Sequence, residues 1–233
     1  MDYADRQVVV TGGTGALGGA VVAAFVEVGA TCTVPWLHEK EAERFPYRQH
    51  ERVKLVGPVD LADEAAVNRL YAGVPALWAS VHIAGGFAMS PVAKTGKAEL
   101  MQQIDINLVS CFLCCTAAVN AIGGTGQGGR IVNVTSRPAL EWRLGAGMGA
   151  YTASKAAVAA LTVALSEEVA KDGILVNAVA PSIMDTPANR AAMPKANYDL
   201  WPKAEEVAAT IVFLASPENK VTRAAIVPVY GRS

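Results

Sequence analysis

The sequence predicts a doubly wound α/β fold, a parallel β-sheet with helices on both faces, built as a single domain. Short β-branched runs alternate with longer Ala-rich segments, which is the pattern of strands joined by crossover helices. The strand runs are almost continuously apolar, as in Val8-Val9-Val10, and such strands are buried on both faces. A length of 233 residues suits one domain, and no linker, repeat or low-complexity tract divides the chain.

The expected elements follow from this alternation. The β-branched runs predict strands at 8–11, 31–34, 53–56, 79–83, 130–134, 175–180 and 225–229. The Ala-rich stretches between them predict helices at 18–28, 64–71, 99–120, 151–171 and 205–214. A glycine-rich run at 123–129 predicts a surface turn before the fifth strand.

Composition narrows the class of protein. The 20 Lys and Arg against 21 Asp and Glu give a net charge of −1, which argues against nucleic acid or an anionic membrane as the main partner. Apolar residues at 52% and charged residues at 18% exclude a disordered polar chain. The N-terminal segment has no secretory pattern, and no apolar run is long enough to span a membrane. The clustering of Cys111, Cys114 and Cys115, with Cys32 apart, does not suit a disulfide framework, so a cytoplasmic location is expected.

A glycine loop, Thr11–Gly18, directly follows the first strand and opens the first helix. Glycines at 12, 15 and 18 have the spacing of a dinucleotide-binding loop, which needs a tight turn, close backbone approach to the pyrophosphate and close helix–strand packing. The helix N-terminus offers free N–H groups to the phosphates. The alternative is an ordinary glycine-rich turn, and the strand-then-helix context favours phosphate binding.

The segment after the second strand leaves the choice between NAD and NADP open. Glu39 could bind the ribose as an acid, but it also suits the first turn of the next helix. His38 and Lys40 could meet a 2′-phosphate, or they could belong to a solvated helix start.

Tyr151 and Lys155 are four residues apart, so on a helix they share one face. A free tyrosine has a pKa of about 10, and a neighbouring ammonium lowers it toward neutrality, as proton transfer requires. Such a pair is also common on a solvated helix face. Ser136 ends a buried-looking strand, where α/β sheets bind ligands, and its hydroxyl could bind a reacting oxygen. The alternative for Ser136 is an N-cap or turn serine.

Taken in order, these motifs resemble the short-chain dehydrogenase/reductase family from Thr11 to about Gly231. The matching segments are the glycine loop, Asp60, Ile83-Ala84-Gly85-Gly86, Asn107 in Asp105-Ile106-Asn107-Leu108, Val134-Thr135-Ser136, Tyr151-x-x-x-Lys155 and Asn177-Ala178-Val179-Ala180-Pro181-Ser182.

The resemblance implies a Rossmann-like oxidoreductase that moves hydride between NAD(H) or NADP(H) and a small carbonyl or alcohol. The implied catalytic residues are Asn107, Ser136, Tyr151 and Lys155. Tyr151 would be the acid/base and Ser136 would hold the substrate oxygen. Lys155 would bind the nicotinamide ribose and lower the Tyr151 pKa. Asn107 would stabilise a kink and a water of the proton relay.

The resemblance also implies a set of coenzyme-binding residues. Within it, Asp60 would face the adenine, and Ile183 and Thr186 would hold the nicotinamide carboxamide. The full set is Gly12, Thr14, Gly15, Ala16, Leu17, Gly18, Trp36, Asp60, Leu61, Ala84, Gly85, Gly86, Tyr151, Lys155, Pro181, Ser182, Ile183 and Thr186.

Three departures from the family pattern stand out. Ala16 occupies a position where many members have glycine, and the usual Asn-Asn-Ala-Gly is His82-Ile83-Ala84-Gly85. Ser136 also lies fifteen residues before Tyr151, which predicts a longer loop beside the substrate.

Local segments are similar to dihydropteridine reductase. They are Gly12–Gly18, Ala84-Gly85-Gly86-Phe87 and Asp185–Pro194. That enzyme lacks the strand-end serine that this chain has at 136, and it carries an Asp where Trp36 stands. A pterin reductase is therefore the second hypothesis, and a dinucleotide-sensing protein without turnover is the third.

The remaining expectations concern the substrate, metals and assembly. Phe87, Trp142, Asn189, Arg190 and Trp201 are the candidate substrate residues, the last three in a short lid at about 186–202. No metal site is expected from the cysteine cluster, and His82 is either a satisfied core histidine or a coenzyme neighbour. The small apolar residues of the 151–171 helix, together with the resemblance, predict a homodimer or homotetramer.

Overall fold

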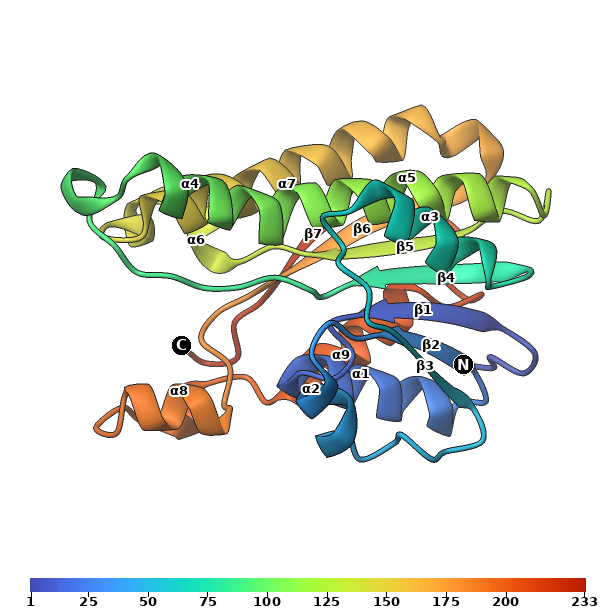
Figure 1. The fold of residues 1–233 in the computed structure, drawn as a ribbon, viewed down its shortest axis with the longest axis horizontal. Helices are drawn as coiled ribbons and strands as arrows, with labels where there is room; N and C mark the ends of the chain where they lie inside the picture. The colour runs from blue at the N-terminus through green and yellow to red at the C-terminus, as the bar shows by residue number, and fades with distance from the viewer.

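Seven parallel strands form one sheet in the computed structural model, which describes all 233 residues (Figure 1). The strands are β1 (Gln7–Thr11), β2 (Thr31–Pro35), β3 (Val53–Val56), β4 (Leu77–His82), β5 (Gly129–Val134), β6 (Ile174–Pro181) and β7 (Ile226–Val229). Their order across the sheet is β3-β2-β1-β4-β5-β6-β7. The predicted doubly wound parallel fold is confirmed.

Helices cover both faces of the sheet. They are α1 (Ala16–Glu27), α2 (Glu39–Arg44), α3 (Glu64–Ala72), α4 (Lys97–Ile104), α5 (Ser110–Gly123), α6 (Arg137–Leu140), α7 (Gly149–Glu168), α8 (Pro187–Ala192) and α9 (Ala204–Leu214). Figure 1 shows α3, α5 and α7 on one face and α1 with α9 on the other. A core cluster lies beneath each face, with 24 buried residues on the α1 side and 18 on the α5 side.

The central strands are apolar because they have no solvated face. Every residue of β4 and β5 is buried, and the side chains of each strand alternate between the two cores. Val8 and Val10 belong to the α1-side core, whereas Val9 belongs to the α5-side core. The period-2 geometry therefore explains why an unbroken valine run is a strand here.

The strand order reverses between β1 and β4. The chain leaves β1 toward β2 and β3 on one side, and it returns through β4 to β5, β6 and β7 on the other. The loops after β1 and β4 therefore diverge at the carboxyl end of the sheet. In sheets of this kind, ligands bind in the crevice at that reversal point.

The predicted helix 99–120 lies within a continuous helix, Lys97–Gly123, in which α4 passes through an unexpected π-helical turn at Asp105–Val109 into α5. The side chain of Asn107, in the middle of this turn, bonds to backbone and side chains outside its own helix. A π-turn inserts an extra residue, and such turns recur at functional sites. Residue patterning alone does not distinguish it from α-helix, because the apolar residues stay periodic.

The Lys97–Gly123 stretch of 27 residues is long and apolar enough to cross a membrane by length and composition alone. In the fold it is a core helix pair, because seven residues of α5 are buried against the sheet and α3. Three further short helices, α2, α6 and α8, lie outside the five expected helices. The expected 151–171 helix instead spans Gly149–Glu168 and is followed by a 3₁₀ turn, Ala170–Asp172.

The glycine loop provides a test of this packing. A Cβ atom at Gly18 would lie 2.0 Å from the Gly12 carbonyl oxygen and 2.6 Å from Gly13 Cα, both of which are backbone atoms. We expect Gly18→Ala to lower the free energy of unfolding by about 1–3 kcal/mol, because α1 must move off the loop. The matched control is Gly19→Ala, where the nearest atom is 4.0 Å away. That change is expected to stabilise α1 by roughly 0.5–1 kcal/mol. Urea unfolding of both variants checks the pair, and equal effects would contradict the close approach.

Candidate functional site

A cavity of about 390 Å³ lies at the reversal point between β1 and β4. Most of its lining residues come from the glycine loop and from the segments that follow β2, β3 and β4. The predicted coenzyme residues that line it are Gly12, Thr14, Gly15, Ala16, Leu17, Gly18, Trp36, Asp60, Leu61, Ala84 and Gly85. The other predicted coenzyme residues, Gly86, Tyr151, Lys155, Pro181, Ser182, Ile183 and Thr186, lie outside its lining.

The glycine loop has the features of a phosphate cradle. Gly12 has a φ of 66°, and a Cβ atom there would lie 2.7 Å from the backbone nitrogen of Ala84. Gly15 precedes α1 without any side-chain cap, and no acidic residue occupies the first turn of that helix. The first N–H groups of α1 are therefore available to an anion, with the positive end of the helix dipole behind them. These residues suit a dinucleotide.

One aromatic side chain, Trp36, lines the cavity. Trp36 is half-buried, and its ring lies so close to Gly57 that a Cβ atom there would come within 2.5 Å of it. His38 and Glu41 also line the cavity. Lys40 does not line the cavity, and none of the 21 lining residues is a lysine or an arginine.

Lys155 is buried at the base of the predicted catalytic group. Its side chain is 6% exposed, and its Nζ atom donates to the Val134 carbonyl oxygen at 3.0 Å. This burial excludes the solvated helix face that the sequence left open. Desolvation lowers the pKa of Lys155 to about 8, because burial penalises the ammonium. A Cβ atom at Gly85 would come 2.5 Å from Asn107 Oδ1 and 3.2 Å from Lys155 Nζ, so a larger residue would displace the loop after β4 or the Asn107 amide.

Asn107 ties the π-turn to both neighbouring elements. Its Oδ1 atom accepts from the Gly86 N–H at 3.0 Å, and its Nδ2 atom donates to the Gly86 carbonyl oxygen at 3.0 Å. Nδ2 also donates to Ser154 Oγ on α7 at 3.1 Å. One amide therefore holds the loop after β4 against the helix that carries Tyr151 and Lys155. The structure places a π-turn at this residue, and the expected kink and relay water stay predictions.

Ser136 and Tyr151 face the same site. The Ser136 hydroxyl is buried, and it has no hydrogen-bond partner. Ser136 precedes α6 at the N-cap position, but its side chain caps nothing, so the alternative of a capping serine is not supported. Burial raises the pKa of Tyr151, and the nearby Ser136 hydroxyl opposes that rise, although the two oxygens do not form a hydrogen bond in this structure.

His82 is a satisfied core histidine. Its Nδ1 atom pairs with Asn133 Oδ1 at 2.8 Å, and its Nε2 atom pairs with Ser80 Oγ at 2.8 Å. Asn133 Nδ2 in turn donates to Thr162 Oγ1 on α7 at 2.9 Å. Because that amide donates through Nδ2, its Oδ1 atom is the acceptor and His82 carries its proton on Nδ1. The chain of bonds joins β4, β5 and α7 below the catalytic residues.

The cysteine cluster meets this histidine, which spacing did not predict. The ligand atoms of His82, Cys111 and Cys115 lie within 4.8 Å of one another, all buried. Cys115 Sγ lies 3.5 Å from His82 Nδ1 and 3.5 Å from Asn133 Oδ1. A structural zinc site has four ligands and a deprotonated imidazole nitrogen. Here the His82 Nδ1–H donates a hydrogen bond to Asn133 Oδ1. The contacts of His82, Cys111 and Cys115 are therefore hydrogen bonds of the core.

The substrate side is formed by loops after β4 and β5. The Phe87 ring packs edge-on against Tyr151, with centroids 5.0 Å apart and planes at 81°. Trp142 is 75% exposed, and its indole N–H donates to the Ala139 carbonyl oxygen at 2.9 Å. The long loop expected before Tyr151 contains α6 and a 3₁₀ turn, Trp142–Gly145.

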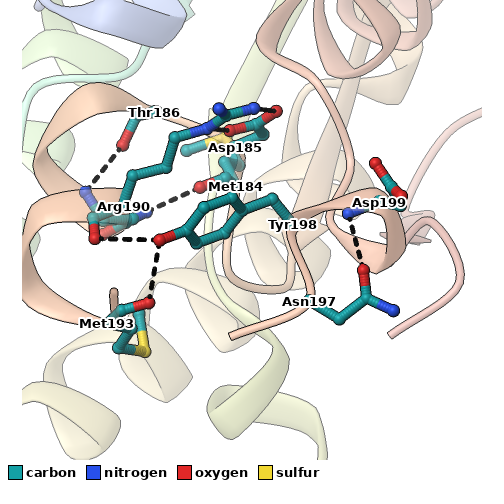
Figure 2. A network of polar contacts seen from close by, with 9 residues as sticks. Met184, Asp185, Thr186, Arg190, Met193, Asn197, Tyr198 and Asp199 are labelled. Carbon is teal, nitrogen blue, oxygen red and sulfur yellow. Dashed lines mark hydrogen bonds and ion pairs between the residues drawn. The ribbon is translucent and has the colours of Figure 1, made fainter. Parts of the chain in front are cut away.

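The three predicted lid residues contact other residues of the same segment, and Figure 2 shows Arg190 beside Asp185 and Tyr198. Arg190 forms a two-pronged ion pair with Asp185, at 2.6 and 2.8 Å, and its guanidinium lies 4.6 Å above the Tyr198 ring. Asn189 donates to the Met184 carbonyl oxygen at 2.8 Å. Trp201 is buried against Tyr198. The structure therefore engages these side chains within the lid, and their contact with a substrate stays a prediction.

Several lining residues were missed by the sequence analysis. Ile106 and Ser110 enter the cavity from one side of the π-turn, and Glu41 enters from α2. The first two are four residues apart and flank Asn107, so helical spacing was a usable signal. Glu41 gave no signal, because α2 was not expected.

Comparison with known proteins gives a consistent result. The short chain dehydrogenase family profile matches residues 6–197. Galactitol 2-dehydrogenase of Rhizobium johnstonii is 33% identical over 245 residues, covering 96% of this chain and 93% of its own. A solved short chain dehydrogenase/reductase family protein superimposes with a TM-score of 0.90 at 26% identity, covering 99% and 98%.

A second solved structure, ElxO with NADP bound, shares the fold with a TM-score of 0.88 at 23% identity, over 97% of each chain. The local similarity to dihydropteridine reductase is not among these findings and stays a prediction. The parallel sheet, the glycine loop, the buried Lys155 and the family profile all indicate the same family. The chain belongs to the short-chain dehydrogenase/reductase family, and it is an NAD(P)-dependent oxidoreductase that acts on alcohol or carbonyl groups.

Proposed function

We propose that this chain interconverts a ketone and a secondary alcohol, with Tyr151 moving the proton and Ser136 binding the reacting oxygen. The observation that carries the proposal is the buried Ser136 hydroxyl without a partner. A buried hydroxyl without a hydrogen bond costs stability, so such an atom is expected where a ligand supplies the missing partner. It lies close to the Tyr151 phenol, which is the proton-transfer group of the proposal.

The coenzyme is proposed to bind across the cavity, with its pyrophosphate on the loop from Gly12 to Gly18. When bound, the nicotinamide supplies or accepts the hydride. Lys155 would bind the adjoining ribose, and Pro181, Ser182, Ile183 and Thr186 would line the carboxamide end. Asp60 and Leu61 would face the adenine.

Four polar side chains have separate roles in the proposed reaction. In reduction, Tyr151 gives its phenolic proton to the substrate oxygen as that oxygen gains electrons, and Ser136 donates a hydrogen bond to the same atom. In oxidation, the phenolate takes the proton back. Burial raises the pKa of Tyr151, and the Ser136 hydroxyl opposes that rise. A Lys155 ammonium beside the bound coenzyme would favour the phenolate further. Asn107 would hold a relay water beside Gly86.

Cavity charge supports NAD(H) over NADP(H). Glu41, Asp60 and Asp105 line the cavity, and the only basic lining residue is His38. A 2′-phosphate would add negative charge beside carboxylates without any guanidinium or ammonium to pair with it. A 2′-hydroxyl has no such requirement.

Location and assembly are proposed on indirect grounds. All four cysteines are buried and free, which supports a reducing, cytoplasmic setting. Leu100, Met101, Phe112 and Val163 are exposed on α4, α5 and α7. Such an apolar helix surface supports a homodimer or homotetramer.

Two other functions compete with this one. A pterin reductase would use the same coenzyme site, and a dinucleotide sensor would bind without turnover. The sensor has no need for the unpartnered hydroxyl beside Tyr151, which favours an enzyme. A carbonyl panel that includes a quinonoid dihydropterin separates the three, with oxidation of reduced nicotinamide followed by its near-ultraviolet absorbance.

Replacing the proton-transfer group tests the mechanism. Tyr151→Phe is expected to lower kcat by about 10²–10⁴-fold, because the ring stays in place while the proton donor is lost. Coenzyme affinity should change little. Tyr47→Phe is the matched control, since that ring packs beside Phe45 away from the cavity and its loss of a hydroxyl should leave kcat unchanged. Full turnover by Tyr151→Phe would exclude Tyr151 as the acid/base.

Ser136→Ala separates catalysis from stability. The hydroxyl has no partner to lose, so the free energy of unfolding should stay the same or rise slightly. Turnover should fall by about 10²–10³-fold. Thr135→Val is the contrast, because Thr135 Oγ1 donates to the Lys155 carbonyl oxygen at 2.6 Å and its loss should destabilise the fold. Normal turnover together with lower stability in Ser136→Ala would refute the substrate contact.

Coenzyme preference is measured by titrating the protein with NADH and NADPH. NADH is expected to bind at least tenfold more tightly, which corresponds to about 1.4 kcal/mol. Glu41→Lys should reduce that ratio by providing a cation for the 2′-phosphate. Glu51→Lys, on the exposed surface outside the cavity lining, is the charge-matched control. Tighter binding of NADPH by the unmodified chain would overturn the preference.

A further inference from the structure

Apolar side chains gather at the mouth of the site, where they are exposed to solvent. They come from the segments that follow β4, β5 and β6, that is, from the carboxyl end of the sheet. The members of this apolar wall are Phe87, Met89, Val92, Trp142, Leu144 and Ile183, all exposed. Soluble proteins do not usually cluster exposed apolar residues unless the cluster binds something.

Part of the wall is placed by contacts between two loops. The segment after β4 runs beside the segment before α7, since Ser90 and Met148 form an isolated parallel β-bridge. Cβ atoms at Gly147 and Gly149 would lie 3.4 Å from Met89 Cε and 3.1 Å from Val92 Cγ2. Met89 and Val92 therefore pack against the backbone just before Tyr151, in the segment that follows Trp142 and Leu144.

This surface continues directly into the catalytic group. Phe87, at 62% exposed, lies edge-on against the Tyr151 ring, whose phenol is the proposed proton donor. Ile183 begins the segment after β6, just beyond Pro181 and Ser182. A molecule whose oxygen meets Tyr151 and Ser136 would thus lie with the rest of its body on the wall.

The wall offers few hydrogen bonds. The indole N–H of Trp142 is already used by the Ala139 carbonyl oxygen. The Ser90 and Thr95 hydroxyls bond to each other at 3.0 Å. The charged residues of these loops, Lys94, Glu141 and Arg143, are exposed to solvent. A polyhydroxylated substrate would lose water contacts here without replacement, and such losses are costly.

We infer that the substrate is a bulky, uncharged ketone or secondary alcohol with an aromatic or alicyclic ring, rather than a sugar alcohol. The inference rests on the proposed function of the Tyr151 site. The ring would lie against Phe87 and Trp142, because aromatic side chains provide large, rigid apolar contact surfaces. Hydride and proton would both be delivered at the carbon and oxygen of one carbonyl, so the apolar body needs no reactive group of its own.

The experiment compares substrates of opposite polarity on the full-length chain with NADH or NAD⁺. Benzylacetone and 4-phenylcyclohexanol are the apolar probes, and galactitol and sorbitol are the polyols. We expect kcat/KM for the apolar probe to exceed that for the hexitols by at least about 100-fold. Equal or faster turnover of a hexitol would refute the inference while leaving the proposed function standing.

Variants test the wall itself. Trp142→Ala and Phe87→Ala are expected to raise KM for benzylacetone by roughly tenfold or more, with unchanged NADH affinity. The matched control is Phe213→Ala, an exposed aromatic residue on α9, on the opposite face of the sheet from α7. It should leave KM unchanged. Unchanged KM in both wall variants would refute the contact.

Absence of all turnover would count against the proposed function and not against the wall. Saturation-transfer NMR of benzylacetone with the NADH-loaded protein then measures binding directly. Binding that is lost in Trp142→Ala but kept in Phe213→Ala would support the apolar site. Equal binding in the two variants, or none in the unmodified protein, would overturn it.

Discussion

A buried ammonium sets the constraint on which the site depends. The Lys155 side chain donates one hydrogen bond, to the Val134 carbonyl oxygen, and it has almost no contact with solvent. A charge in that position is costly unless the surroundings supply partners. The loop after β4 is held close to this ammonium. Gly85 passes near Nζ, and Asn107 joins the neighbouring Gly86 to α7. The same geometry that accommodates the ammonium leaves Tyr151 and Ser136 facing one place.

Hydrogen bonds between the central strands and α7 also hold Lys155 and Tyr151 in position. The bonds from Ser80 through His82 and Asn133 to Thr162 link two central strands to α7, about two turns beyond Lys155. Thr135 adds a bond to the Lys155 carbonyl oxygen. Satisfied polar networks of this kind specify one packing arrangement, because any other would leave buried donors unpaired. The helix that carries the proposed catalytic residues, α7, is thus held by polar contacts within an otherwise apolar core.

Sequence reasoning predicted the fold class and the seven strands because their causes are local. Alternation, apolar strand runs and the glycine spacing at 12, 15 and 18 need no tertiary contact to be recognised. The π-turn was missed because it depends on what Asn107 bonds to across space. The meeting of His82 with Cys115, 33 residues away, was missed for the same reason. The Ser136 side chain illustrates both limits: its position at a strand end was predictable, but the absence of a cap bond was not. Arg190 and Trp201 contact other residues of the predicted lid, which spacing did not foresee, and their contact with a substrate stays a prediction.

The indole of Trp36, which lines the cavity, has one more consequence. Trp36 is the single tryptophan in that lining, and it lies against the flat backbone of Gly57 rather than in the hydrophobic core. Its emission should therefore be sensitive to occupancy of the crevice, whereas Trp78, enclosed between two arginines on the sheet, should be indifferent to it. Trp36 is therefore an intrinsic fluorescence probe of dinucleotide binding.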